Sequence, residues 1–282
     1  MTLTPPLKPA SIASLITPDH RFTYEAAGSA HHTPLVFLHG IGGAARAWRE
    51  QLVFFGERYH AIAWDMPGYG GSKPLDATSI GTLAGALKDF LANVGAKRPV
   101  LVGHSIGGMI VQQLLADHPE IAGGAVLAQT SPAFGKADGD WQKAFIDARF
   151  GPLDRGATME DMAPSIVSEL VGDAPDVAGC EVARDCMASV PEATYRATVT
   201  ALLGFDQRAA LANITVPVLV LAGEKDTNAS APMMAKMATF IPGAQAVELP
   251  GAGHLANLEQ PQAFNAALDR FLSTASFGRP AS

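Results

Sequence analysis

The sequence predicts an α/β fold in which a mostly parallel central sheet is flanked by helices. Short apolar runs of strand length recur along the chain, and segments of helix length separate them. Continuous apolar runs are typical of strands that are buried on both faces, as in parallel sheets. One long segment, from about residue 132 to 206, lacks strand patterns. A Gly-x-Ser-x-Gly sequence at residues 103–107 directly follows one of the apolar runs.

The apolar runs define the strands of the expected sheet. These strand-like runs cover residues 34–38, 59–64, 99–102, 124–128, 216–222 and 246–249, and residues 22–26 alternate like a further strand. Helix patterns between them include residues 79–94, 107–118 and 262–274. Because strands and helices alternate, most neighbouring strands are expected to run parallel.

The strand-free segment contains helix patterns at 141–150, 159–171, 180–189 and 193–203, with turn residues such as Gly151-Pro152 between them. In open parallel sheets, ligands bind at the carboxyl ends of the strands. A helical insertion is therefore expected to cover that edge. The predicted domains are an irregular, proline-rich arm at 1–20, a core at 21–131 and 207–276, and a helical cap at 132–206.

Composition restricts the function classes. The chain has 282 residues and a formal net charge of -7, without a basic run beyond Lys97-Arg98. This acidic balance argues against nucleic acid or an anionic membrane as partner. The two cysteines, Cys180 and Cys186, are too few for a disulfide framework. No signal peptide or membrane span is expected, which favours a cytoplasmic protein with buried thiols. The oligomeric state stays open, and a homodimer is one option.

Ser105 is the predicted nucleophile. Gly103 and Gly107 allow a sharp turn between the strand at 99–102 and the following helix, with the serine at its tip. A serine hydroxyl is a weak nucleophile at neutral pH, so it needs a general base and an acid that orients this base. In proteins with this turn, the acid and then the histidine follow the serine along the chain.

Only two histidines follow Ser105. His118 lies at a helix end, where a solvated side chain is the ordinary role. His254 lies in a glycine-containing loop after the last strand, and it is the predicted base. For the acid, Asp226 is preferred, because it lies deeper in the loop after residues 218–222 than its competitor Glu224 does. The other position that such folds use, after the strand at 124–128, offers only Gln129, Thr130 and Ser131.

An oxyanion formed at a substrate carbonyl needs two positioned hydrogen-bond donors. The backbone N–H of Ile106, at the start of a helix, is one candidate, and the helix dipole also favours negative charge there. The backbone N–H of Ile41, in the glycine-rich turn at 39–43, is the second. Apolar residues of the cap are candidates for the substrate pocket, although ordinary packing explains such residues equally well. These candidates are Trp141, Phe145, Phe150 and Met187, together with Phe134 and Met162.

The order of these motifs resembles the α/β-hydrolase superfamily. The motifs that support this resemblance are His39-Gly40, the segments 65–72, 103–108 and 223–226, and Gly253-His254. The resemblance covers about residues 22–273 and implies a Ser105-Asp226-His254 triad with an oxyanion hole at Ile41 and Ile106. It implies a structural role for 65–72 and for His104.

Within the superfamily, the chain is most similar to small bacterial carboxylesterases and 3-oxoadipate enol-lactonases. It differs from the latter at His39-Gly40, where they commonly carry Gly-Thr. Ser105 excludes haloalkane dehalogenases and many epoxide hydrolases, whose nucleophile is an aspartate. Perhydrolases of the haloperoxidase type usually carry methionine where this chain has Ile106.

The expected function is therefore hydrolysis of a small-molecule carboxylic ester or lactone, without a metal or an organic cofactor. The alternative is a C–C bond hydrolase of ring-fission products, which uses the same triad. Its anionic substrate would need a cationic group near the cap, for which the sequence offers Arg149, Arg155, Arg184 and Arg196. A third option is a receptor or scaffold built on the same fold. Such proteins often lose a member of the triad, whereas all three residues are present here.

Overall fold

The computed structural model describes residues 10–136, 139–275 and 277. A sheet of eight strands forms its centre, in the order β1-β2-β4-β3-β5-β6-β7-β8. The strands from β3 onward pair in parallel, whereas β1 and β2 are antiparallel to their neighbours. Their bounds are β1 Ala13–Ile16, β2 Thr23–Ala27, β3 Pro34–Leu38, β4 His60–Trp64, β5 Val100–His104, β6 Gly124–Ala128, β7 Val218–Gly223 and β8 Gln245–Leu249. The expected mostly parallel sheet is confirmed.

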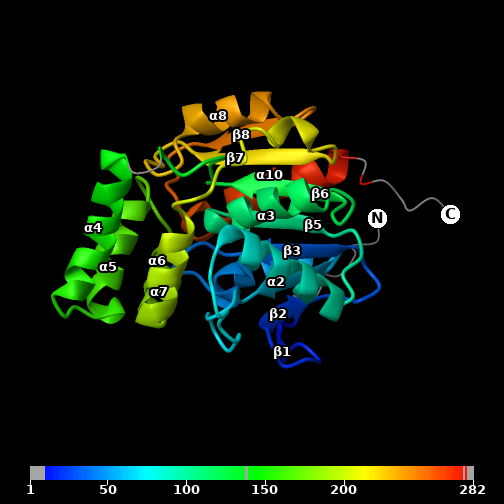
Figure 1. Cartoon of the computed structure of the whole chain (residues 1–282). Coiled ribbons are helices and arrows are strands. Elements are labelled where there is room, and N and C mark those ends of the chain that lie inside the picture. Colours follow the sequence, from blue (N-terminus) through cyan, green and yellow to red (C-terminus); the bar gives the residue numbers. More distant parts are fainter. Residues whose placement is uncertain (1–9, 137–138, 276, 278–282) are drawn as a thin grey trace.

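Helices cover both faces of the sheet (Figure 1). Side chains of β3 alternate between two hydrophobic clusters: Val36 and Leu38 pack in one, Leu35 and Phe37 in the other. Burial on both faces explains why the central strands read as continuous apolar runs. The first cluster includes side chains of α2 (Ile80–Asn93), α3 (Ile106–Asp117) and α8 (Ala231–Thr239). The second includes side chains of η1 (Ala45–Trp48), α1 (Arg49–Phe55), α9 (Ala256–Glu259) and α10 (Pro261–Thr274).

Four helices lie between β6 and β7, beyond one end of the sheet, and are here named the helical insertion (Figure 1). They are α4 (Asp140–Asp154), α5 (Met159–Leu170), α6 (Val177–Ala188) and α7 (Glu192–Ala201). The chain enters and leaves the insertion at one place, where Ala133 and Asp206 form an antiparallel bridge. A short turn of 3₁₀-helix, η2 (Leu211–Asn213), then leads into β7.

Two details differ from the sequence-based expectation. The arm at 1–20 was expected to be irregular, but Ala13–Ile16 forms β1, paired with β2. All four residues of β1 are exposed, so this edge strand lacks the apolar pattern that marks the central strands. The turn expected at Gly151-Pro152 is also wrong, because α4 continues through both residues to Asp154. Pro152 is two residues from the end of α4, so the hydrogen bond that its missing N–H would make is lost only in the last turn.

Two further sequence expectations can be compared with the structure. Cys180 and Cys186 are buried free thiols, as expected. Within the described part of the chain, no helix is long and apolar enough to cross a membrane.

Candidate active site

Ser105 lies at the tip of a tight turn between β5 and α3. Its backbone has φ 54° and ψ -121°, a conformation that costs energy for a residue with a side chain. The turn needs glycine on both sides. A Cβ on Gly103 would lie 2.6 Å from the backbone nitrogen of Gly108, and a Cβ on Gly107 would lie 2.6 Å from the carbonyl oxygen of Leu38. This strained turn therefore requires glycine at both position 103 and position 107.

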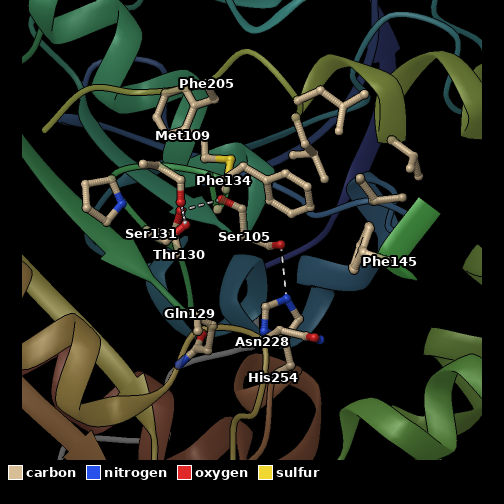
Figure 2. Close-up of a pocket in the computed structure, with 18 of the residues that line it drawn as sticks. Ser105, Met109, Gln129, Thr130, Ser131, Phe134, Phe145, Phe205, Asn228 and His254 are labelled. Carbon is tan, nitrogen blue, oxygen red and sulfur yellow. Dashed lines mark hydrogen bonds between the residues drawn. The ribbon is translucent and has the colours of Figure 1, made fainter. Parts of the chain in front are cut away.

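His254 and Asp226 complete a hydrogen-bonded chain with Ser105. The hydroxyl of Ser105 donates to Nε2 of His254 at 3.0 Å, and Nδ1–H of His254 donates to Oδ2 of Asp226 at 2.7 Å (Figure 2 shows the first of these bonds). Asp226 is 4% and His254 8% exposed. The three predicted residues therefore meet, although 149 residues separate Ser105 from His254 in the chain.

Asp226 is held as a carboxylate. Burial alone would raise its pKa, but the His254 imidazole and the backbone N–H groups of Ala229 and Asn228 outweigh burial, so the pKa lies below its usual value. Both N–H groups donate to Oδ1, at 3.0 and 2.8 Å. Glu224, the competing acid, instead accepts the backbone N–H of Gly251 at 2.7 Å at an exposed position. The structure thus pairs Asp226, and not Glu224, with His254.

The loop that carries His254 is fixed from two sides. The buried carboxylate of Glu259 accepts the backbone N–H groups of Gly253 at 2.9 Å and Leu255 at 2.8 Å, the residues on either side of His254. It also accepts the N–H of Gly172 at 2.6 Å, which ties the loop to the helical insertion. The backbone N–H of His254 donates to the carbonyl of Leu170, at the end of α5, at 2.7 Å. The orientation of His254 therefore depends on the insertion as well as on the sheet.

His104 supports the same loop from the strand side. Its Nε2–H donates to the carbonyl oxygen of His254 at 2.6 Å. Burial, together with the neighbouring His254, lowers the pKa of His104 to about 3, so that its imidazole is neutral at physiological pH. The structural role implied for His104 takes the form of a direct bond to the backbone of His254.

One predicted oxyanion donor directly follows Ser105, and the other lies in a turn that approaches Ser105. Ile106 is the first residue of α3, and Ile41 lies in the turn after β3. Gly40 brings this turn close, because a Cβ there would lie 3.1 Å from Cβ of Ser105. Among the described residues, neither the N–H of Ile41 nor that of Ile106 donates to a protein acceptor. Both donors are therefore available to a bound oxygen.

The turn after β3 is held by His39. Its Nδ1–H donates to the carbonyl of Gly40 at 2.8 Å, and its Nε2 accepts the backbone N–H of Met66 at 3.1 Å. Burial lowers the pKa of His39, which keeps it in the neutral form that this arrangement requires. Residues 65–72 thus contribute to the site through the backbone, by fixing the histidine beside Ile41.

A cavity of about 930 Å³ opens above Ser105 and His254, between the sheet edge and the insertion. Figure 2 shows Ser105 and His254 facing each other, with Met109, Phe134 and Phe145 around the serine. Much of the wall is apolar, as expected for a small-molecule site. The apolar wall includes Ile41, Met109, Phe134, Phe145, Met187 and Phe205.

The predicted substrate-pocket residues divide into two groups. Trp141, Phe145 and Met187 line the cavity, and Trp141 stacks on Phe145 with ring centroids 5.6 Å apart. Phe150 does not line it, because its ring lies under the guanidinium of Arg196, 5.0 Å away, on another face of α4. Met162 packs in the core cluster and is likewise absent from the wall. Among the four predicted substrate-binding residues, Phe150 is thus the one outside the cavity wall in the described structure.

Sequence reasoning also missed polar groups at the site. Gln129 is fully buried with φ 42°, and its amide nitrogen donates to the carbonyl of Leu221 at 3.0 Å, while Oε1 has no partner among the described residues. Asn228 lines the cavity beside His254. Gln129 lies where some related folds place the acid, and a lone amide gives no sequence signal. Across the described residues, no cluster of three His, Cys, Asp or Glu side chains is arranged to hold a metal ion.

Comparison with known proteins identifies the family of the chain. Residues 35–267 match the family described as "Alpha/beta hydrolase family". The chain is 28% identical to 3-oxoadipate enol-lactonase 2 of Acinetobacter baylyi, covering 91% of this chain and 94% of that protein. It is 27% identical to (E)-2-((N-methylformamido)methylene)succinate hydrolase of the same organism, over 86% and 90% of the two chains. A hydrolase from Pseudomonas aeruginosa PA01 has a similar structure, with a TM-score of 0.80, 27% identity, and coverage of 94% and 99%.

Proposed function

The chain belongs to the alpha/beta hydrolase family, and from that premise we propose that it is a serine hydrolase of carboxylic esters or lactones. The observation that carries the proposal is the hydrogen-bonded chain from Ser105 through His254 to Asp226, at 3.0 and 2.7 Å, with Ser105 and His254 lining a largely apolar cavity. Nucleophile, base and orienting acid in this geometry are the requirements of acyl transfer.

In the proposed acylation step, Oγ of Ser105 attacks the substrate carbonyl while Nε2 of His254 takes the hydroxyl proton. The Asp226 carboxylate holds the imidazole in the tautomer with a free Nε2 and stabilises the imidazolium that forms. His254 then delivers the proton to the departing alkoxide oxygen. For an ester the alcohol leaves, whereas for a lactone it stays attached to the acyl chain.

The tetrahedral intermediate carries a negative oxygen, which the N–H groups of Ile41 and Ile106 would bind. Donors that are already in place for this charge are often the largest single catalytic contribution. In deacylation, His254 removes a proton from a water molecule that attacks the acyl-enzyme, and the proton then returns to Ser105. His39 and Gly40 contribute by holding Ile41 at this position.

The proposed role of the helical insertion is to act as a cap that encloses the acyl or alcohol part of the substrate. Phe134 and Phe145 meet edge to face, with ring centroids 5.0 Å apart, and form part of an apolar wall close to Ser105. Such a wall suits an uncharged carbon chain or ring next to the scissile bond.

The proposal is tested with the purified full chain on p-nitrophenyl esters of increasing acyl length and on a panel of lactones. The expected result is hydrolysis that is lost in Ser105→Ala and in His254→Ala, while circular dichroism and unfolding stay close to those of wild type. Ester or lactone hydrolysis that persists in Ser105→Ala would contradict the mechanism. A ring-fission diketone that is cleaved much faster than every ester and lactone would assign the site to the C–C hydrolase instead.

A further inference from the structure

The cavity carries a charge opposite to that of the whole chain. The formal net charge of the protein is -7, yet the cavity wall within the described residues has one lysine, two arginines and one carboxylate. The carboxylate, Asp206, is bound by the guanidinium of Arg208 at the rim. Lys136 and Arg149 are the remaining cations. A cationic cleft in an acidic protein attracts anionic ligands.

Arg149 is much less exposed than Arg208, the other arginine of this cavity wall. Its side chain is 14% exposed, compared with 67% for that of Arg208. It lies on α4 one turn after Phe145, and its guanidinium sits over the Phe145 ring at 5.2 Å. The apolar wall close to Ser105 therefore continues through Phe145 to a positive charge.

The hydrogen-bonding capacity of Arg149 is largely unused. A guanidinium has five N–H donors. Among the described residues Arg149 makes one hydrogen bond, a long one of 3.4 Å to Glu169, whose side chain is 65% exposed. Arg196, on the same insertion, instead makes two bonds of 2.7 Å to Glu192 and Asp154. A largely buried guanidinium that makes so few hydrogen bonds can accept a ligand carboxylate as an additional partner.

We propose that Arg149 is a specificity-determining residue that binds a carboxylate of the substrate, so that the substrate is an anionic ester or lactone. This inference rests on the proposed function. The ester carbonyl lies at Ser105, an apolar spacer lies along Phe134 and Phe145, and the carboxylate meets the guanidinium. Of the four arginines considered from the sequence, Arg149 alone lines the cavity in the described structure.

The test compares mono-p-nitrophenyl esters of dicarboxylic acids, from succinate to suberate, with neutral p-nitrophenyl esters of the same acyl length. At its best length, wild type should favour the anionic ester by about 10- to 100-fold in kcat/KM, chiefly through a lower KM. Arg149→Gln should remove this preference, because kcat/KM should fall far more for the anionic esters than for the neutral esters of the same length.

Matched variants separate a specific contact from a general charge effect. Arg196→Gln removes the same charge from the same insertion outside the cavity, so the preference should persist. Glu169→Gln removes the competing carboxylate and should strengthen it. Binding of monomethyl adipate to Ser105→Ala, measured by calorimetry, gives a readout that is independent of turnover, and Arg149→Gln should weaken it at least tenfold.

The outcomes distinguish the two proposals. If neutral esters are hydrolysed at Ser105 but no anionic ester is preferred at any length, the carboxylate inference is overturned and the serine hydrolase stands. An equal loss of preference in Arg149→Gln and Arg196→Gln would also overturn it. If no ester or lactone is hydrolysed, the proposed function fails, and the calorimetric result alone then decides whether Arg149 binds a carboxylate.

Discussion

The Glu259 carboxylate accepts the backbone N–H of Gly253 at 2.9 Å, and Gly253 is the residue directly before His254. The other oxygen of this carboxylate accepts the backbone N–H of Leu255, the residue directly after His254. Glu259 touches none of the reacting groups of the proposed mechanism, so it is a positioning residue. Its effect on catalysis is expected to act through the orientation of the imidazole.

Replacing Glu259 with glutamine keeps its size but puts an amide NH₂ next to backbone N–H donors. We expect a loss of about 1–3 kcal/mol in the free energy of unfolding, because a buried donor loses its acceptor. We also expect kcat to fall about tenfold with KM nearly unchanged, since the imidazole is less well oriented. Urea unfolding and steady-state kinetics measure both. Glu248→Gln, at an exposed position on β8, is the control and should change neither.

Asp226→Asn tests the orienting acid. An amide can no longer stabilise the imidazolium and favours the wrong tautomer of His254, so kcat should fall by about 10³- to 10⁴-fold while KM changes little. Steady-state kinetics on the best ester measures the effect. Glu224→Gln, in the same loop, should stay within about twofold of wild type. An equal loss in the two variants would contradict the assignment of Asp226.

The lowered pKa of His104 predicts that the free energy of unfolding depends on pH. Its pKa of about 3 in the folded state lies below the usual value of 6.5, so the unfolded chain binds more protons between these pH values. The stability that His104 contributes is thus complete above about pH 6.5 and decreases as pH falls toward 3. At pH 5 the loss should reach about 2 kcal/mol.

His104→Gln lacks this titration but keeps a side-chain N–H for the His254 carbonyl. Urea unfolding of both proteins at pH 7 and pH 5 isolates the effect, because other titrating groups contribute to both proteins. The stability of wild type relative to the variant should decrease by about 2 kcal/mol between these pH values. A relative stability that stays constant would show that His104 is not held in its neutral form.

Adding a single Cβ atom at Gly172 should disturb the contact between the helical insertion and the loop that carries His254. A Cβ on Gly172 would collide with the carbonyl oxygen of Gly251 and lie 2.7 Å from the nitrogen of Gly253. Gly172→Ala should therefore displace the loop and lower kcat/KM by about 10- to 100-fold. Gly85→Ala is the control, because its Cβ would meet no atom within 4 Å. It should keep full activity and stabilise α2 by about 0.5–1 kcal/mol.

The central strands β3 to β7 were predictable because they are buried on both faces, so each reads as a local apolar run. β1 was not, because its residues are exposed and its strand conformation depends on pairing with β2. The length of α4 was missed for the opposite reason. Gly151-Pro152 is a strong local turn signal, and yet the helix tolerates it close to its end.

The residues proposed for chemistry were predictable because motif glycines and chain order mark Ser105, Asp226 and His254. The positioning residues carry no such mark. Glu259 reads as a surface glutamate, and only the tertiary fold buries it beside three backbone N–H groups. Phe150 and Phe145 look equivalent in sequence, but they lie on different faces of α4, and only Phe145 reaches the cavity.

Labelling with a fluorophosphonate, followed by mass spectrometry of the digested chain, tests the central claim most directly. A fluorophosphonate reacts with an activated serine, and the proposed mechanism predicts one adduct per chain, on the peptide that contains Ser105. Labelling should be absent in Ser105→Ala and strongly slowed in His254→Ala. An adduct at any other residue, or an unchanged labelling rate in His254→Ala, would contradict the proposed mechanism.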